Sequence, residues 1–227
     1  MANVKPKNSM GVIFDLDGVL VDTGEFHKQS WYDLAEKEGF DMSDELFYST
    51  FGMQNYQIIP MLAGRQLPAE QINRLSEWKE QHYRELIVDK LVLSQPIKAL
   101  IEDLRSKGFF LAVGSSAPRV NLDFILDHLH LRTYFDAYVT CEDVSNSKPA
   151  PDTFLKAAEK LSLSPRRCVV VEDAVQGVEA AKAAGMAVVA VTTTRNRKDL
   201  AQADVIVDSL AELKAEDFIK LLTDADH

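Results

Sequence analysis

The chain has 227 residues, of which 46% are hydrophobic and 26% are charged, the balance of a globular protein. This composition excludes a disordered or collagen-like chain, and no apolar run approaches the roughly 20 residues that a membrane-spanning helix needs. The 35 acidic and 25 basic residues give a formal net charge of −10. Because such a surface repels nucleic acid and anionic membranes, we expect neither as a partner.

The N-terminal segment and the cysteines bear on the cellular compartment. Residues 1–10 contain lysines but no apolar core, so they do not resemble a signal peptide. Cys141 and Cys168 are too few for a disulfide framework, and the acidic neighbours of Cys141 should raise its thiol pKa. We therefore expect two reduced, structural cysteines and a cytoplasmic protein.

Apolar runs that end in polar residues predict strands, and apolar residues at helical spacing predict the helices between them. The expected order is strand 11–16, an interruption, helix 100–104, strand 109–114, helix 122–129, a weak strand 137–140, helix 154–161, strand 168–171, helix 175–184, and strands 187–191 and 204–207. Such alternation is typical of βαβ units. We predict an α/β fold: a Rossmann-like parallel sheet with helices on both faces.

Residues 25–87 interrupt this alternation. They contain no strand-like run, whereas Phe26, Trp31 and Leu34 have helical spacing, as do Ile72 and Leu75 further on. The pattern predicts an inserted, all-helical cap domain at 25–87. Residues 1–24 and 88–227 would then form the Rossmann-like core.

Polar residues that could take part in catalysis or binding lie at the predicted strand ends, where ligands bind in open parallel sheets. Alone, each has an ordinary explanation: an Asp-Gly turn, a helix cap, a solvated turn or a surface lysine. Together they predict one site, and the residues are Asp15, Asp17, Ser115, Lys148, Glu172 and Asp173.

These residue types suit phosphoryl transfer. One aspartate can attack phosphorus while another, two residues on, protonates the leaving oxygen. Because a carboxylate and a phosphate repel each other, a divalent cation is needed, and Mg²⁺ prefers carboxylates, water and phosphate oxygens. Ser115 with the following N–H groups could bind phosphate oxygens, and Lys148 could neutralise the transferred group.

Four segments in order resemble the motifs of the haloacid dehalogenase (HAD) superfamily over essentially the whole chain. They are Asp-Leu-Asp-Gly-Val-Leu-Val-Asp-Thr at 15–23, Ser115, Lys148-Pro149, and Val171-Glu172-Asp173 with Gly177. The helical insertion is similar to the cap of the subgroup that carries an α-helical lid between the first two motifs.

The resemblance implies a role for each of these residues. Asp15 would be the nucleophile, and Asp17 the general acid and base whose backbone carbonyl reaches Mg²⁺. The metal set would be Asp15, Asp17, Glu172 and Asp173, with Asp173 a direct ligand and Glu172 a ligand or its partner. Ser115 and Lys148 would hold phosphate oxygens. Because dehalogenases lack the second acid, the resemblance favours phosphotransfer over dehalogenation.

Within the superfamily, the chain most resembles β-phosphoglucomutase and related sugar phosphatases. Thr23 falls at the hinge position, His27 matches a histidine that contacts the general acid, and Lys79 matches a cap lysine that touches substrate. Gly52 lies in the cap loop. The ordinary alternatives are a polar helix position for His27 and an exposed charge for Lys79.

Two positions depart from the mutases. Asn55 stands where they carry an arginine that grips the substrate's second phosphate, and asparagine cannot form such charged contacts. In the second-motif loop, Ser116 begins a segment in which the mutases have a lysine, for which Arg119 is a candidate replacement. We therefore predict a Mg²⁺-dependent phosphatase that acts on a small phosphorylated metabolite. The predicted substrate-binding residues are Thr23, His27, Gly52, Asn55, Lys79 and Ser116.

Three alternatives stay open. One is a β-phosphoglucomutase-type phosphotransferase, and another is a non-catalytic protein that binds a partner through its cap. The third, phosphonate hydrolysis, needs a Schiff-base lysine, and neither Lys28 nor Lys37 has the surroundings of one. A monomer is what the resemblance implies for the oligomeric state.

Overall fold

The computed structural model describes residues 9–50 and 53–224. Its centre is a six-stranded parallel sheet with the strand order β3-β2-β1-β4-β5-β6. The strands are β1 (Gly11–Phe14), β2 (Phe110–Gly114), β3 (Ala137–Val139), β4 (Cys168–Glu172), β5 (Ala187–Val191) and β6 (Val205–Val207). All six predicted strands are confirmed, the first ending before Asp15.

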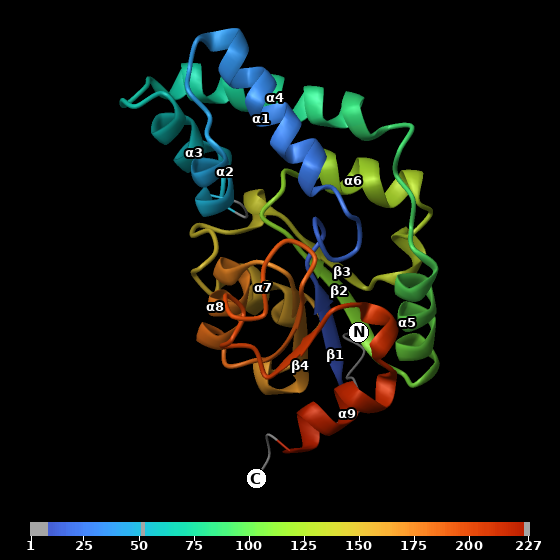
Figure 1. Ribbon diagram of the computed structural model, residues 1–227. Coiled ribbons are helices and arrows are strands. Elements are labelled where there is room, and N and C mark those ends of the chain that lie inside the picture. Colours follow the sequence, from blue (N-terminus) through green and yellow to red (C-terminus); the bar gives the residue numbers. More distant parts are fainter. Residues whose placement is uncertain (1–8, 51–52, 225–227) are drawn as a thin grey trace, which may run out of the picture.

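Helices cover both faces of the sheet, as predicted (Figure 1). One face carries α5 (Gln95–Ser106), α6 (Arg119–His128) and α9 (Ala215–Asp224), and the other carries α7 (Asp152–Lys160) and α8 (Val175–Ala183). Because side chains alternate along a strand, Phe14 is buried against the first group and Ile13 against the second. Helix α9 was not predicted, although its Phe218 and Leu222 lie one turn apart and are buried.

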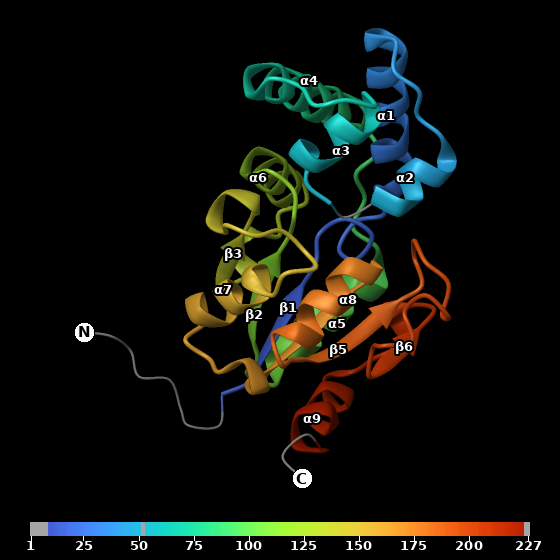
Figure 2. The same cartoon turned by 90° about the vertical axis from the view of Figure 1, so that its left-hand side faces the viewer.

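The regular elements among the described residues of the insertion are all helices. It contains α1 (Gly24–Glu38), α2 (Asp44–Thr50), α3 (Asn55–Leu62) and α4 (Ala69–Ile87), which gather above the sheet (Figure 2). These helices have an apolar cluster of their own, which includes Trp31, Leu34, Ile59 and Leu75. Tyr83, near the end of α4, joins the cluster of the sheet instead. The last turns of α4 therefore seat the insertion on the core.

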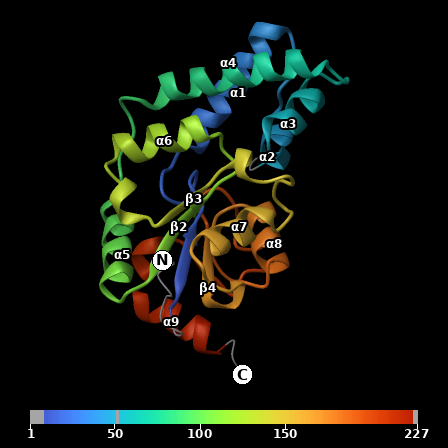
Figure 3. The same ribbon diagram turned by 180° about the vertical axis from the view of Figure 1, so that it is seen from behind.

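Short 3₁₀ turns complete the regular structure, at Arg132–Tyr134, Cys141–Asp143, Pro165–Arg167 and Leu210–Glu212. Seen from behind, α6 lies directly beneath α4 (Figure 3). Within the described ranges, no helix is both long enough and apolar enough to cross a membrane.

The strand order places the site at one point of the sheet edge. Strands β1 and β4 are neighbours, but the connection that follows β1 packs on the α5 face and the connection that follows β4 packs on the α8 face. Connections that diverge in this way leave a crevice at the carboxyl ends of the two strands. Asp15 and Asp173 follow β1 and β4 directly, so both enter this crevice.

Candidate active site

A cavity of about 370 Å³ lies between the strand ends and the helical insertion. Core and insertion both line it, which brings together predicted residues that are far apart in the sequence. Those lining it are Asp15, Asp17, His27, Asn55, Lys79, Ser115, Ser116, Lys148, Glu172 and Asp173. Thr23 is not in the lining but binds Asp17, and Gly52 lies outside the described residues.

Lys148 joins two of the predicted acids at the floor of the cavity. Its Nζ lies 2.8 Å from Asp15 Oδ1 and 2.6 Å from Glu172 Oε1, and the lysine is buried. Burial opposes the charged form, but the two carboxylates outweigh it and raise the pKa of Lys148 above its usual range. Burial, reinforced by Glu172, raises the pKa of Asp15 from 3.8 to about 7 against the opposing effect of Lys148.

The acids of this floor fit a divalent cation. Asp15, Glu172 and Asp173 each offer a carboxylate oxygen, and these oxygens lie within 4.8 Å of one another. Asp173 Oδ1 is buried and has no hydrogen-bond partner among the described residues, whereas Oδ2 accepts from Thr194 Oγ1 at 2.5 Å. Burial and the neighbouring acids raise the pKa of Asp173 well above its usual value. A bound Mg²⁺ would give Asp173 Oδ1 a partner and would offset the repulsion among the three carboxylates.

Glu172 is held more tightly than a free metal ligand would be. Besides Lys148, it accepts the backbone N–H groups of Asp173 and Ala174 on Oε2, both at 2.8 Å. The side chain of Asp17 does not belong to the carboxylate cluster. Of the predicted metal set, Asp15, Glu172 and Asp173 each offer a side-chain oxygen to one cation, and Glu172 is also held by Lys148 and two backbone N–H groups.

Two glycines make room for these carboxylates. A Cβ at Gly18 would lie 2.0 Å from Asp173 Oδ2, and its φ of +83° is strained for other residues. A Cβ at Gly177, in the first turn of α8, would lie 1.8 Å from Glu172 Oε1. The fourth motif therefore needs glycine at 177 because the side chain of Glu172 occupies that space.

Gly177→Ala is expected to destabilise the protein by about 2–4 kcal/mol, because Glu172 is buried and cannot leave its Lys148 partner without cost. Activity should fall with the displaced carboxylate. The matched control is Gly24→Ala, whose Cβ would have its nearest neighbour, a Thr194 methyl, at 3.8 Å. Denaturant unfolding of both variants tests this, and equal stabilities would contradict it.

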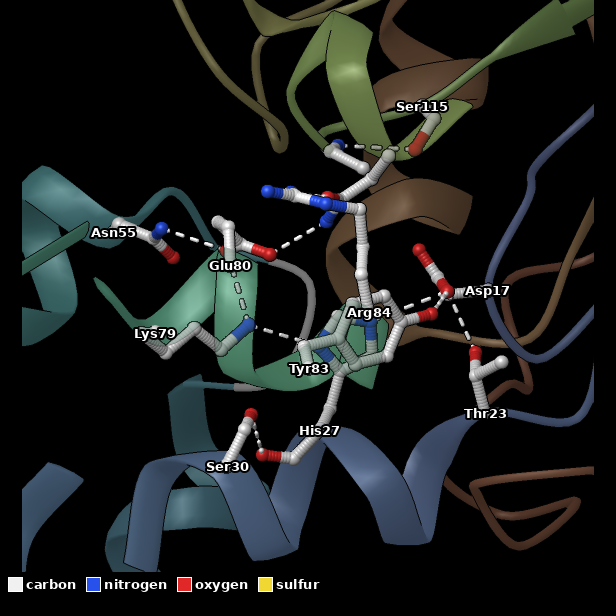
Figure 4. A network of polar contacts seen from close by, with 12 residues as sticks. Asp17, Thr23, His27, Ser30, Asn55, Lys79, Glu80, Tyr83, Arg84 and Ser115 are labelled. Carbon is white, nitrogen blue, oxygen red and sulfur yellow. Dashed lines mark hydrogen bonds and ion pairs between the residues drawn. The ribbon is translucent and has the colours of Figure 1, made fainter. Parts of the chain in front are cut away.

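Asp17 is surrounded by hydrogen-bond donors (Figure 4). Its Oδ1 accepts from Thr23 Oγ1 at 2.6 Å and from Tyr83 Oη at 2.9 Å, and it lies 3.2 Å from His27 Nε2. Burial alone would raise its pKa, but His27 and the hydroxyl donors lower the pKa of Asp17 to about 2. Asp17 is therefore ionised near neutral pH in the free protein.

Tyr83 is not among the residues that the sequence predicts for the site. It lies one turn after Lys79 on α4 and its ring stacks on His27 at 3.9 Å between centroids. That i, i+4 spacing from a candidate lysine was the only signal that could have found it.

Lys79 is buried, with 2% of its surface exposed, so the alternative of an exposed charge is wrong. Its Nζ lies 2.9 Å from His27 Nδ1. An ammonium group only donates, so Nδ1 accepts and the Nε2–H of His27 donates to Asp17. His27 thus contacts Asp17 as expected, and Lys79 fixes its ring.

The second-motif loop supplies hydroxyls rather than charge. Ser115 Oγ accepts from the Ala117 N–H at 3.0 Å, and Ser116 Oγ is buried with no hydrogen-bond partner in the described part of the chain. Arg119 pairs with Asp143 at 2.6 Å and does not line the cavity. Arg119 therefore does not replace the mutase lysine, and Ser116 is the group left to meet a ligand.

The two cysteines are both free thiols. Burial, followed by Glu142, raises the pKa of Cys141 to about 12, as the acidic neighbours led us to expect. Cys168 is buried at the start of β4. Cys141 lines the cavity, but its raised pKa keeps it a neutral thiol near neutral pH.

The raised pKa of Asp15 predicts a pH effect on the metal-free protein. A carboxyl whose pKa rises from 3.8 to about 7 on folding contributes stability below pH 4, which is lost as the pH rises through 7. Thermal unfolding in excess chelator should therefore show wild type losing stability relative to Asp15→Asn between pH 4 and pH 8. A difference between the two proteins that stays constant over this range would contradict the assignment.

Comparison with known proteins gives a consistent result. The family model described as haloacid dehalogenase-like hydrolase matches residues 12–191. Fructose-1-phosphate phosphatase YqaB of Escherichia coli K12 is 32% identical over 176 residues, which are 78% of this chain and 93% of the relative. Hexitol phosphatase B of the same strain is 29% identical over 221 residues, 94% and 98% of the two chains. The structure of β-phosphoglucomutase from Clostridium difficile superposes with a TM-score of 0.87 and 28% identity, covering 95% of this chain and 98% of that chain.

Proposed function

The chain belongs to the haloacid dehalogenase-like hydrolase family, and we propose that it hydrolyses the phosphate ester of a small phosphorylated carbohydrate through an aspartyl-phosphate on Asp15. Its relatives and structural neighbours are phosphatases and phosphomutases, so the enzyme is one or the other. One observation carries the proposal. Asp15, Lys148 and Asp173 form a buried group, and the nearby Asp17 accepts hydrogen bonds from surrounding donors such as Thr23.

The two carboxylates divide the chemistry. A carboxylate oxygen of Asp15 forms a bond to phosphorus as the bond from phosphorus to the carbohydrate oxygen breaks. Asp17 is ionised in the free protein, so it must take up a proton as the substrate binds, and it then gives that proton to the leaving carbohydrate oxygen. Water then attacks phosphorus and gives its proton to Asp17, while the bond to Asp15 breaks and inorganic phosphate leaves. Lys148 and the hydroxyls of Ser115 and Ser116 hold the phosphate oxygens.

Mg²⁺ would be held by Asp15 and Asp173, oriented by Glu172, with the backbone carbonyl of Asp17 as a further ligand. When bound, it would neutralise the charge of the phosphate group that Asp15 approaches. The orphaned Asp173 Oδ1 is the observation that supports this cofactor.

Residues 25–87 would act as a cap over the core made of residues 1–24 and 88–227, with Thr23 at the hinge. Contacts across the boundary support a closed cap. Gln57 Oε1 accepts from Ser147 Oγ at 3.0 Å, and Glu80 Oε2 accepts from Asn121 Nδ2 at 2.5 Å. Closure excludes bulk water and brings His27 and Lys79 to the reacting groups.

A second candidate function is a β-phosphoglucomutase-type transfer, which the superposition on a β-phosphoglucomutase favours. Against it, Asn55 is neutral and already donates its Nδ2 to Glu80 Oε1 at 2.7 Å. A mutase must hold a bisphosphate intermediate, and this position offers no charge for the second phosphate.

The deciding experiment screens phosphorylated carbohydrates with the purified protein and Mg²⁺, measuring inorganic phosphate. We expect release from at least one sugar or hexitol monophosphate. Conversion of β-glucose 1-phosphate to glucose 6-phosphate, dependent on β-glucose 1,6-bisphosphate and without phosphate release, would establish the mutase instead. No turnover of any ester, including p-nitrophenyl phosphate, would leave the partner-binding alternative.

We also propose that the enzyme acts as a monomer, which is what the resemblance to the family implies. Light scattering after size exclusion tests this. The cytoplasmic location stays a prediction from the sequence.

A further inference from the structure

Glu80 is a buried carboxylate at the cap end of the cavity, with 5% of its surface exposed. Three elements provide donors to it (Figure 4). Oε1 accepts from Lys79 Nζ at 3.0 Å, on α4 itself, and from Asn55 Nδ2 at 2.7 Å, at the start of α3. Oε2 accepts from Asn121 Nδ2 at 2.5 Å, on core helix α6. The phosphoryl-transfer steps above use none of these contacts.

Glu80 does not contact the reacting groups directly, but a chain of polar contacts connects it to Asp17. From Asp17, the chain of contacts runs to His27 Nε2 at 3.2 Å, from His27 Nδ1 to Lys79 Nζ at 2.9 Å, and from Lys79 to Glu80. Burial opposes ionisation of Glu80, but Lys79, His27 and the Asn55 amide lower its pKa below the usual value. The far end of the cavity therefore contains a fixed negative charge.

This charge cancels the one cation available there. Among the described residues that line the cavity, the basic side chains are His27, Lys79 and Lys148. Lys148 is committed to Asp15 and Glu172, and Lys79 pairs with Glu80 at 3.0 Å. Glu142 adds a further carboxylate to the lining. A second phosphate at the cap end would meet no uncompensated positive charge.

Hydroxyl groups fit this end of the cavity far better. A sugar or polyol hydroxyl can accept from Lys79 or Asn55 and can donate to Glu80, whereas a phosphate dianion only accepts and is repelled by the carboxylate. Asn73, Ser76 and the Trp31 ring also line this region, and such groups bind neutral polyols. A phosphate could accept the second N–H of Asn55 Nδ2, but it would then lie beside the Glu80 carboxylate, which repels it.

We propose that Glu80 is a specificity-determining residue that selects monophosphates with an uncharged polyhydroxyl end and rejects sugar bisphosphates. The inference rests on the proposed phosphatase function and narrows its substrate class. It also assigns Asn55 and Asn121 a role: they hold the carboxylate in place when the cap is closed.

The test compares fructose 1-phosphate and fructose 6-phosphate with fructose 1,6-bisphosphate, using wild type and Glu80→Gln. Glutamine keeps the shape and an acceptor oxygen but removes the charge, which frees Lys79 to face a second phosphate. We expect wild type to prefer a monophosphate, and Glu80→Gln to raise the ratio of kcat/KM for the bisphosphate to that for the better monophosphate by at least about tenfold, mainly through KM. The matched control is Glu85→Gln, which removes the same charge from an exposed position on α4 and should leave the ratio unchanged.

A second variant makes the test independent of how Glu80→Gln folds. Asn55→Ala uncovers Glu80 Oε1 without adding a cation, so the same ratio should fall or stay at the wild-type value. The inference is overturned if wild type prefers the bisphosphate, if Glu80→Gln slows all substrates equally, or if Asn55→Ala raises the ratio. In each of these cases hydrolysis of p-nitrophenyl phosphate by wild type keeps the proposed function intact. If wild type hydrolyses no ester, the function itself fails.

Discussion

Replacing Asp15 with asparagine should lower kcat by at least about 10⁴-fold while leaving the protein folded. Asparagine has nearly the same shape but cannot form the acyl phosphate. Lys148 would keep Glu172 as a partner at 2.6 Å, so the substitution leaves no buried charge unpaired. The loss of one of three crowded acids should even stabilise the metal-free protein.

Phosphate release under single-turnover and steady-state conditions measures this loss. The matched control is Asp22→Asn, an exposed aspartate in the same segment, which should have nearly wild-type activity. Trapping of covalent phosphate on wild type, and its absence from Asp15→Asn, would distinguish a nucleophile from an aspartate that only binds metal. Near-normal hydrolysis by the variant would rule out the covalent mechanism.

The two aspartates of the first motif have opposite environments, although they are only two residues apart. Asp15 lies among Glu172 and Asp173, where burial raises its pKa to about 7, and Asp17 lies among donors that lower its pKa to about 2. In the metal-free protein these directions are the reverse of what the proposed roles need, because a nucleophile must be ionised and a proton donor must be protonated. Here the neighbours of Asp15 call for a cation, whereas those of Asp17 are fixed hydrogen bonds from Thr23 and Tyr83.

The part of the site that the sequence predicts is the part that the sheet fixes. Asp15, Ser115 and Asp173 each follow a strand whose apolar run is plain in the sequence, and parallel strands bring such residues to one edge. The weak strand at 137–140 and the helices on both faces were found by the same periodicity. Helix α9 was not predicted, although its buried Phe218 and Leu222 have the spacing of one helix face.

The cap side of the site depends on how helices cross, which residue spacing does not determine. Glu80 lines the cavity and Tyr83 reaches Asp17 only because α4 lies across the core above α6 (Figure 3). Asn121, which binds Glu80, is an ordinary polar position in the sequence of α6. Polar residues on a helix most often face solvent, so only the packed structure could assign these to a buried network.

Removal of the divalent cation should stop the reaction, and Asp173→Asn should have the same effect in the presence of Mg²⁺. Mg²⁺ binds the folded chain through acids that repel one another, so it should stabilise the fold by mass action, about 2.7 kcal/mol at a hundredfold excess over Kd. For a chain of this length that is a rise in Tm of about 5–10 °C. Asp173→Asn should lose this rise, and in excess chelator it should be at least as stable as wild type, because burial and Glu172 make the ionised Asp173 unfavourable.

Calcium makes the test more specific. Its larger radius and looser coordination should satisfy the acids and raise Tm, yet hold Asp15 too far from phosphorus for attack, so Ca²⁺ should inhibit the Mg²⁺-loaded enzyme. Thermal unfolding and phosphate release are measured on wild type, Asp173→Asn and the exposed control Asp22→Asn, with Mg²⁺, with Ca²⁺ and with chelator. Full activity of wild type in chelator, or a Mg²⁺-induced rise in Tm that Asp173→Asn retains, would mean that the orphaned oxygen of Asp173 does not bind the cation.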